Sequence, residues 1–141
     1  MTAKGYLSQV RDIDGKIKRL QRNREKLVAD MYSVKSTTAY DADKVQTSIA
    51  GDKLLNLIAK VDEMEREIVD EMIRLEEKKN IIISQIESLR DERYRMLLHD
   101  RYISFMIWEQ IADDMHLDIR YVYKLHGRAL QEFQKAVLHN L

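Results

Sequence analysis

The sequence contains no cysteine and no proline, and only four of its 141 residues are glycine. Without cysteine the chain can form no disulfide bond and offers no thiolate for metal binding or nucleophilic catalysis, so nothing argues for secretion. The longest purely aliphatic stretch covers residues 81–83, and the N-terminus has no apolar run after its first lysine. The aliphatic stretch is too short to span a membrane, and an N-terminus without an apolar run is not an export signal. We therefore expect a cytoplasmic protein with no membrane partner.

Charge of either sign is plentiful but unevenly placed. Lys and Arg total 24, as do Asp and Glu, so the net charge is zero. Residues 1–52 carry ten basic and seven acidic side chains, residues 53–92 carry seven and eleven, and residues 93–141 carry seven and six. The acidic excess therefore lies in the middle of the chain. A charged fraction of 34% beside 45% hydrophobic residues indicates exposed amphipathic helices.

Two long stretches have the apolar spacing of helices, with alternating steps of three and four. The first seam consists of Tyr6, Val10, Ile13, Ile17, Leu20, Leu27 and Met31. The second seam consists of Leu54, Leu57, Val61, Met64, Ile68, Met72, Leu75, Ile82, Ile86 and Leu89. The extra step of four at Met64-Ile68-Met72 predicts local unwinding of the supercoil.

Residues 36–52 lack this periodicity and are rich in Ser, Thr and Asp, which predicts a connector with no more than a short helix. Helices with bare apolar seams must pair, and a 17-residue connector permits an antiparallel hairpin. The basic faces of the first helix should then lie beside the acidic faces of the second. The second helix is longer, so its excess seam should bind another copy of the chain or the C-terminal module.

Residues 108–125 have the spacing of a helix-turn-helix. Ala112 is the small residue where two helices can touch, and Asp118 can cap a second helix. His116 stands where the turn usually has glycine, so it is expected to have a positive φ. Ile107 cannot cap the first helix with its side chain, which predicts an earlier start, near Ser104.

The second helix of this motif has two distinct faces. Its inward stripe consists of Val122, Leu125, Ala129 and Phe133. Its outward face consists of Arg120, Tyr123, Lys124 and Gly127, with Tyr121 and Arg128 at the margins. Arg and Lys can donate to guanine or phosphate, Tyr can donate to phosphate, and Gly lets a backbone approach closely. These six residues are the predicted DNA-binding site.

The predicted fold class is all-α, with a long, coiled-coil-like antiparallel helical hairpin followed by a small helix-turn-helix domain. The hairpin, residues 1–92, is expected to serve interaction and oligomerisation, and residues 93–141 are expected to bind DNA. The second helix of the motif carries few basic residues, so one copy should bind weakly and in a salt-sensitive way. A homodimer or higher homo-oligomer formed through the long helices would present several DNA-binding helices and raise avidity.

The C-terminal third resembles region 4 of the sigma-70 family. The matching segments are 97–102 (its leucine-rich opening helix), 108–112 (its aromatic-Glu-Glu-Ile-Ala segment) and 125–130 (the close of its recognition helix). With the heptad N-terminal helix, segments 43–48 and 51–53 and the long acidic helix, nearly the whole chain resembles small phage-encoded transcriptional regulators of the ArpU and RinA type. The resemblance implies an activator of phage or prophage late genes that binds promoter or operator DNA in the bacterial cytoplasm.

Sigma region 4 also contacts RNA polymerase, so the resemblance raises host RNA polymerase as a partner. No segment resembles the other sigma regions, and we expect a regulator that binds DNA independently. Two alternatives remain open. A small terminase subunit also joins a helix-turn-helix to oligomerising helices, although its DNA-binding module usually comes first. A coiled-coil adaptor would explain the long seams but not the C-terminal module.

Catalysis finds little support in the sequence. There is no glycine-rich phosphate loop, no His-Glu-x-x-His motif and no nucleophile beside a base. His99, Asp113, Asp114 and His116 do not have the spacing of a closed metal site. We therefore expect no enzyme activity, no catalytic residues, no metal site and no cofactor.

Overall fold

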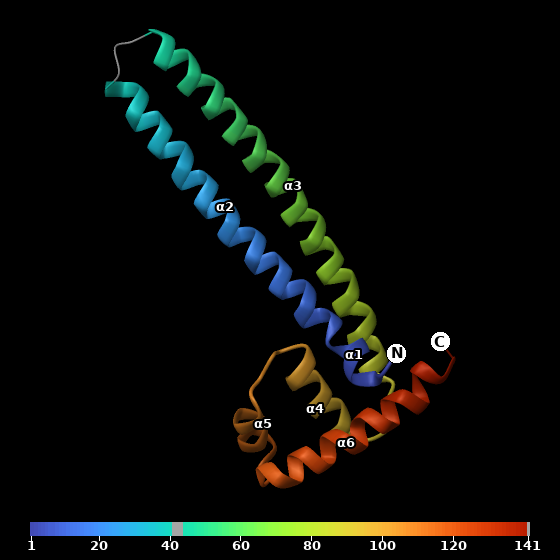
Figure 1. Ribbon diagram of the computed structural model, residues 1–141. Helices are drawn as coiled ribbons and strands as arrows, with labels where there is room; N and C mark the ends of the chain where they lie inside the picture. The colour runs from blue at the N-terminus through green and yellow to red at the C-terminus, as the bar shows by residue number, and fades with distance from the viewer. Residues whose placement is uncertain (41–43, 141) are drawn as a thin grey trace. The chain divides into compact units, whose positions relative to one another are not determined.

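Helices form all the regular structure of residues 1–40 and 44–140, the part of the chain that the computed structural model describes; side chains are described for residues 1–35 and 49–139. The elements are α1 (Ala3–Leu7), α2 (Gln9–Tyr40), α3 (Lys44–Glu87), α4 (Glu92–Tyr102), α5 (Trp108–Met115), α6 (Ile119–Ala136) and the short 3-10 helix η1 (Leu138–Asn140) (Figure 1). The predicted all-α class is confirmed.

The chain divides into two compact units. The first unit contains Met1–Asp14 and Arg74–Leu141, and the second contains Gly15–Ile73. This division differs from the predicted boundary between residues 92 and 93. The difference arises because the first turns of the N-terminal region and the end of α3 share a hydrophobic core with α4, α5 and α6.

The second unit is an antiparallel pair formed by α2 and α3 (Figure 1). The prediction of a connector over residues 36–52 is wrong, since α2 continues to Tyr40 and α3 begins at Lys44. Weak apolar periodicity in this stretch does not prevent helix formation, because the stretch contains no proline and only one glycine, Gly51. Of the predicted connector, residues 41–43 lie outside the described residues.

Ion pairs between the two helices join the basic and acidic faces as expected. Lys16 Nζ lies 2.9 Å from Glu71 Oε1, and an Arg24 guanidinium nitrogen lies 2.7 Å from Glu65 Oε1. Glu71 is buried, with 9% exposed, whereas Met72 is 51% exposed. The predicted place of Met72 in the seam is therefore wrong: Glu71 occupies that position because Lys16 supplies the opposite charge. With Glu71 in place the alternation of three and four is regular from Leu54 to Leu75, and the extra step of four falls later, between Glu71 and Ile86.

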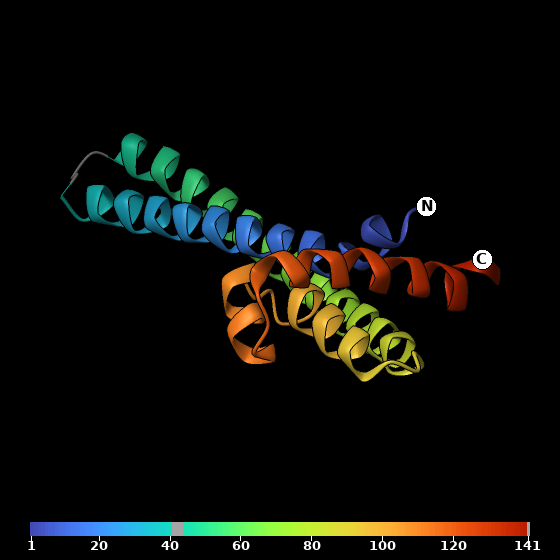
Figure 2. The ribbon, with the colours of Figure 1, turned by 90° about the horizontal axis from the view of Figure 1, so that it is seen from below.

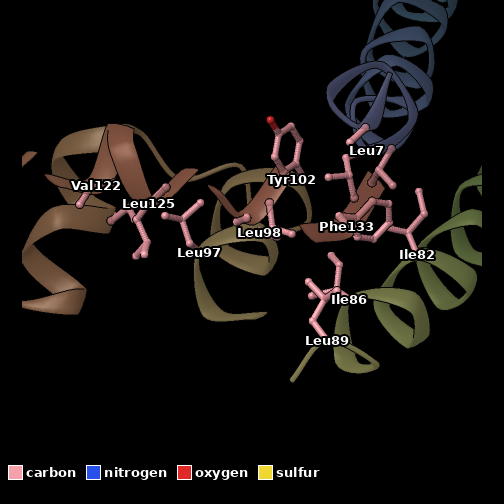
Figure 3. Packing of buried hydrophobic residues seen from close by; sticks show 14 of the residues in the cluster. Leu7, Ile82, Ile86, Leu89, Leu97, Leu98, Tyr102, Val122, Leu125 and Phe133 are labelled. Carbon is pink, nitrogen blue, oxygen red and sulfur yellow. The ribbon is translucent and has the colours of Figure 1, made fainter. Parts of the chain in front are cut away.

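The core of the first unit gathers residues from both ends of the chain. Leu7 of α1, Ile82 and Ile86 of α3 and Phe133 of α6 are all fully buried, and Figure 3 shows them pointing toward one another. The Tyr6 and Phe133 rings lie 6.0 Å apart, and the Tyr6 hydroxyl donates to Gln85 Oε1 at 2.7 Å. As Figure 2 also shows, α6 packs along α4 and against α1. The N-terminus is therefore part of the fold that holds α6.

Within the described ranges, no helix combines the length and the apolar character needed to cross a lipid bilayer.

We predict that Leu7→Ala destabilises the first unit by about 2–5 kcal/mol, the usual cost of removing a fully buried leucine side chain. Urea unfolding followed by the fluorescence of Trp108, the single tryptophan of the chain, measures the effect because Trp108 belongs to the same unit. Leu55→Ala is the matched control, since Leu55 is 65% exposed. Equal stability losses in the two variants would contradict the assignment of α1 to this core.

Candidate nucleic-acid interface

Helix α5, a three-residue turn and helix α6 follow one another as in a helix-turn-helix. Ala112 is buried on α5, and α5 packs directly against α6. Asp118 caps α6, since its side chain accepts a hydrogen bond of 2.8 Å from the backbone N–H of Arg120. The small residue and the N-cap therefore take the places that their spacing predicts.

His116 ends α5 in the left-handed region, with φ 55° and ψ 42°, as expected for the residue that replaces the usual glycine. The Leu117 N–H donates to the Ala112 carbonyl at 3.0 Å and the His116 N–H donates to the Asp113 carbonyl at 3.2 Å. These two bonds form a Schellman motif, which satisfies the last carbonyls of α5 and turns the chain toward α6.

The predicted earlier start of α5 is wrong. The helix begins at Trp108 and has Ile107 as its N-cap, in extended conformation and without a side-chain cap. The Gln110 side chain instead accepts a hydrogen bond of 3.3 Å from the Ile107 N–H. Before it, Phe105 has φ 56°, so the chain between α4 and α5 makes a left-handed turn that breaks helical continuity from Ser104.

The two faces of α6 are separated as the periodicity predicts. Val122, Leu125, Ala129 and Phe133 are all fully buried against the core. Figure 3 labels three of them, Val122, Leu125 and Phe133. The exposed members of the predicted site are Arg120, Tyr123, Lys124, Gly127 and Arg128. They lie along one side of a single helix within three turns, because residues three and four apart are neighbours on a helix surface. The sixth predicted residue, Tyr121, is half-buried.

Tyr121 is held at the margin of this face by α4. A guanidinium nitrogen of Arg93 donates to the Tyr121 hydroxyl at 3.1 Å, and a second lies 3.3 Å from Asp91 Oδ2. The side-chain hydrogen bond that Arg93 donates to Asp91 raises the pKa of the guanidinium, so this group remains charged. Sequence reasoning did not include Arg93, since its proximity to Tyr121 is a contact between residues 28 positions apart.

Behind Tyr123, aromatic and cationic side chains form a cluster. The Trp108 ring lies edge-on to Tyr123 at 5.4 Å and to His126 at 4.7 Å, and the Arg101 guanidinium lies over Trp108 at 4.4 Å. Arg101 also donates to the Met106 carbonyl at 3.0 Å. The edge-on contact with Trp108 restrains the Tyr123 ring, so this side chain has less conformational freedom to lose on binding.

The Tyr102 hydroxyl and His126 Nε2 are 2.7 Å apart, which links α4 to α6 beneath the exposed face. Burial, with smaller effects of the charges on Lys4 and Arg101, lowers the pKa of His126 to about 4. Burial also raises the pKa of the Tyr102 phenol. At neutral pH both groups are uncharged, so Tyr102 can donate to an imidazole nitrogen that accepts.

The charged side chains of α5 are all acidic, and Glu109, Asp113 and Asp114 are exposed. Positive charge is therefore concentrated on α6 and cannot come from α5. Throughout the described part of the chain, no three His, Asp or Glu side chains gather closely enough to hold a metal ion. The exposed side of α6 thus offers hydrogen-bond donors and positive charge to an anionic surface.

Comparisons with protein-family models, with curated proteins and with solved structures found no match for this chain. The likeness to sigma-70 region 4 and to the ArpU and RinA regulators therefore rests on the sequence segments alone.

We predict that the first unit loses stability as the pH falls from 7 to 5. Because the pKa of His126 is about 4 in the folded chain and 6.5 ordinarily, the unfolded chain takes up a proton first. The stability is complete above pH 6.5 and decreases as the pH falls toward 4. We expect a loss on the order of 1 kcal/mol between pH 7 and pH 5, allowing for solvent screening of a partly exposed ring.

Urea unfolding at both pH values measures this loss, and His126→Gln is the reference because it lacks the titrating ring. The wild-type protein should lose more stability than the variant over this interval. The same pH dependence in both proteins would show that His126 does not carry the effect.

Proposed function

We propose that this protein is a sequence-specific DNA-binding transcriptional regulator that reads double-stranded promoter or operator DNA with the outward face of α6. The observation that carries the proposal is the two-sided character of α6. Its inner stripe is fully buried, while Arg120, Lys124 and Arg128 are exposed together on the opposite side. A helix held in this way can enter a major groove and bring cations to bases and phosphates. The resemblance to phage regulators supports an activator of phage or prophage late genes.

Gly127 fits the proposal, since it is exposed on the same side of α6 as Lys124 and Arg128. A Cβ atom at this position would meet nothing within 4 Å, so no neighbour in the fold requires glycine there. Glycine inside a helix costs about 1 kcal/mol relative to alanine. A residue that weakens the helix without serving the fold is understandable where a DNA backbone must approach α6 closely.

Self-association through the second unit completes the proposal. Exposed apolar side chains on the part of α3 that belongs to this unit are Ile49, Leu55, Ile58, Val69, Met72 and Ile73. The same helix exposes the acidic residues Asp62, Glu67 and Asp70, while α2 exposes Arg19, Arg22 and Lys26. A second copy therefore offers both an apolar partner and opposite charge, and two copies would present two α6 helices to DNA.

We predict that Arg120→Ala and Lys124→Ala each weaken binding to the selected DNA by about 5- to 100-fold, because each removes a cation from the groove or from a phosphate. Rounds of selection from random-sequence duplex DNA identify the site, and titrations at two salt concentrations measure affinity. Lys60→Ala is the matched control, since Lys60 is an exposed cation of the second unit. Unchanged affinity in folded Arg120 and Lys124 variants would remove the assignment of this face.

The DNA-binding behaviour of the protein and its number of copies in solution discriminate among the alternatives. Two inverted half-sites would indicate a two-fold dimer. A ring of several copies would favour the DNA-packaging alternative. Failure of the folded protein to bind any duplex would favour an adaptor whose C-terminal helices recognise protein.

We predict that Gly127→Ala stabilises the fold by about 0.5–1 kcal/mol and at the same time weakens DNA binding. Gly51→Ala is the control, because Gly51 also lies inside a helix and a Cβ atom there would also meet nothing within 4 Å. Both variants should be more stable in urea unfolding, and only Gly127→Ala should lose affinity. If both variants bind DNA as the wild type does, Gly127 does not face the DNA backbone.

A further inference from the structure

A small cavity lies in the first unit, apart from the exposed face of α6. Its volume is about 130 Å³, close to the roughly 150 Å³ of cavities that hold one benzene-sized molecule. The lining residues are Lys4, Ser8, Arg11, Arg101, Tyr102 and Trp108. They come from the N-terminal turns and from α4 and α5, all within the same compact unit.

Three of these six residues are cations, and no carboxylate lines the cavity. Arg101 lies over the Trp108 ring at 4.4 Å and donates to a backbone carbonyl, while Arg11 lies over the Phe105 ring at 5.5 Å. Among the residues with described side chains, no Asp or Glu lies within ion-pair distance of Lys4, Arg11 or Arg101. An aromatic ring orients each guanidinium group, and a backbone carbonyl also holds Arg101, without cancelling the positive charge.

The positive field of these cations affects other groups of the unit. After burial, the charges of Lys4 and Arg101 are the causes that lower the pKa of His126. Burial raises the pKa of Tyr102, and the charges of Arg101 and Arg11 act in the opposite direction by favouring the phenolate. Both effects have the sign expected of a region that favours negative charge.

We propose that this cavity binds a phosphate group. Its walls offer the planar N–H forks of two arginines and a lysine ammonium, which suit a multiply charged tetrahedral anion. The hydroxyl protons of Ser8 and Tyr102 are directed to the Lys4 carbonyl and to His126, so the three cations supply the donors. The phosphate comes either from the backbone of bound DNA or from a small phosphorylated molecule. The DNA source rests on the proposed function and fits the contact of Trp108 with Tyr123 of the α6 face; the second source does not depend on it.

The first experiment titrates the full-length protein with inorganic phosphate and follows the emission of Trp108, which lines the cavity and is the only tryptophan. We expect a saturable change that acetate at equal ionic strength does not produce. Lys4→Gln and Arg11→Gln should each weaken phosphate binding at least fivefold. Both residues are exposed, so these changes leave the core intact, and neither is stacked on Trp108. Lys53→Gln, which removes an exposed cation of the second unit, is the control.

The second experiment measures the affinity of the same variants for the selected duplex DNA as a function of salt. If the phosphate belongs to DNA, Lys4→Gln and Arg11→Gln weaken DNA binding and reduce the slope of log affinity against log salt by about 0.9 for each DNA phosphate that the variant no longer neutralises. If the phosphate belongs to a small molecule, phosphate binding falls in these variants while DNA affinity is unchanged.

The proposal is overturned if acetate changes the Trp108 emission as phosphate does, or if neither phosphate nor DNA binding differs between these variants and Lys53→Gln. Absence of DNA binding alone, with the phosphate response intact, would count against the proposed function and not against the cavity.

Discussion

The burial of the inner side of α6 is the packing constraint on which the first unit depends. Val122, Leu125, Ala129 and Phe133 have no exposed surface, and their partners come from α1, α3, α4 and α5. A fully buried stripe fixes the rotation of a helix about its own axis, since any rotation would expose apolar surface and bury charge. The exposure of Arg120, Lys124 and Arg128 is therefore a consequence of the core.

A cluster of aromatic and cationic side chains lies between α4, α5 and α6. Arg101, Trp108, His126 and Tyr102 contact one another through ring faces and one hydrogen bond, and burial keeps the imidazole neutral. Trp108 contacts Tyr123 on the proposed DNA face and also lines the cationic cavity. Both proposed anion-binding surfaces thus share one aromatic side chain, and each relies on cations that remain unneutralised by carboxylates.

The second unit follows a different design, in which one seam and a few ion pairs hold two helices. Ile17, Leu57, Val61 and Ile68 are buried there, whereas several large apolar side chains of α3 are exposed. A two-helix pair can bury only one face of each helix, so additional apolar residues on α3 remain in water until another surface covers them. The exposed apolar surface of α3 is the reason for proposing that a second copy of the chain binds there.

The sequence by itself determined the features that depend on near neighbours along the chain. Helical periodicity identified the long helices and the inward stripe of α6, and local chemistry identified the Asp118 cap and the positive φ of His116. Only the tertiary structure decided that Glu71 enters the seam beside Lys16, that Leu7 packs with Phe133, and that Lys4 and Arg11 meet Arg101 around one cavity. These contacts join residues far apart in the sequence, and no local pattern encodes the distance between them. The prediction of a connector over residues 36–52 is wrong because it relied on the lack of apolar periodicity. A stretch without proline and with one glycine can form a helix even where no apolar stripe is present.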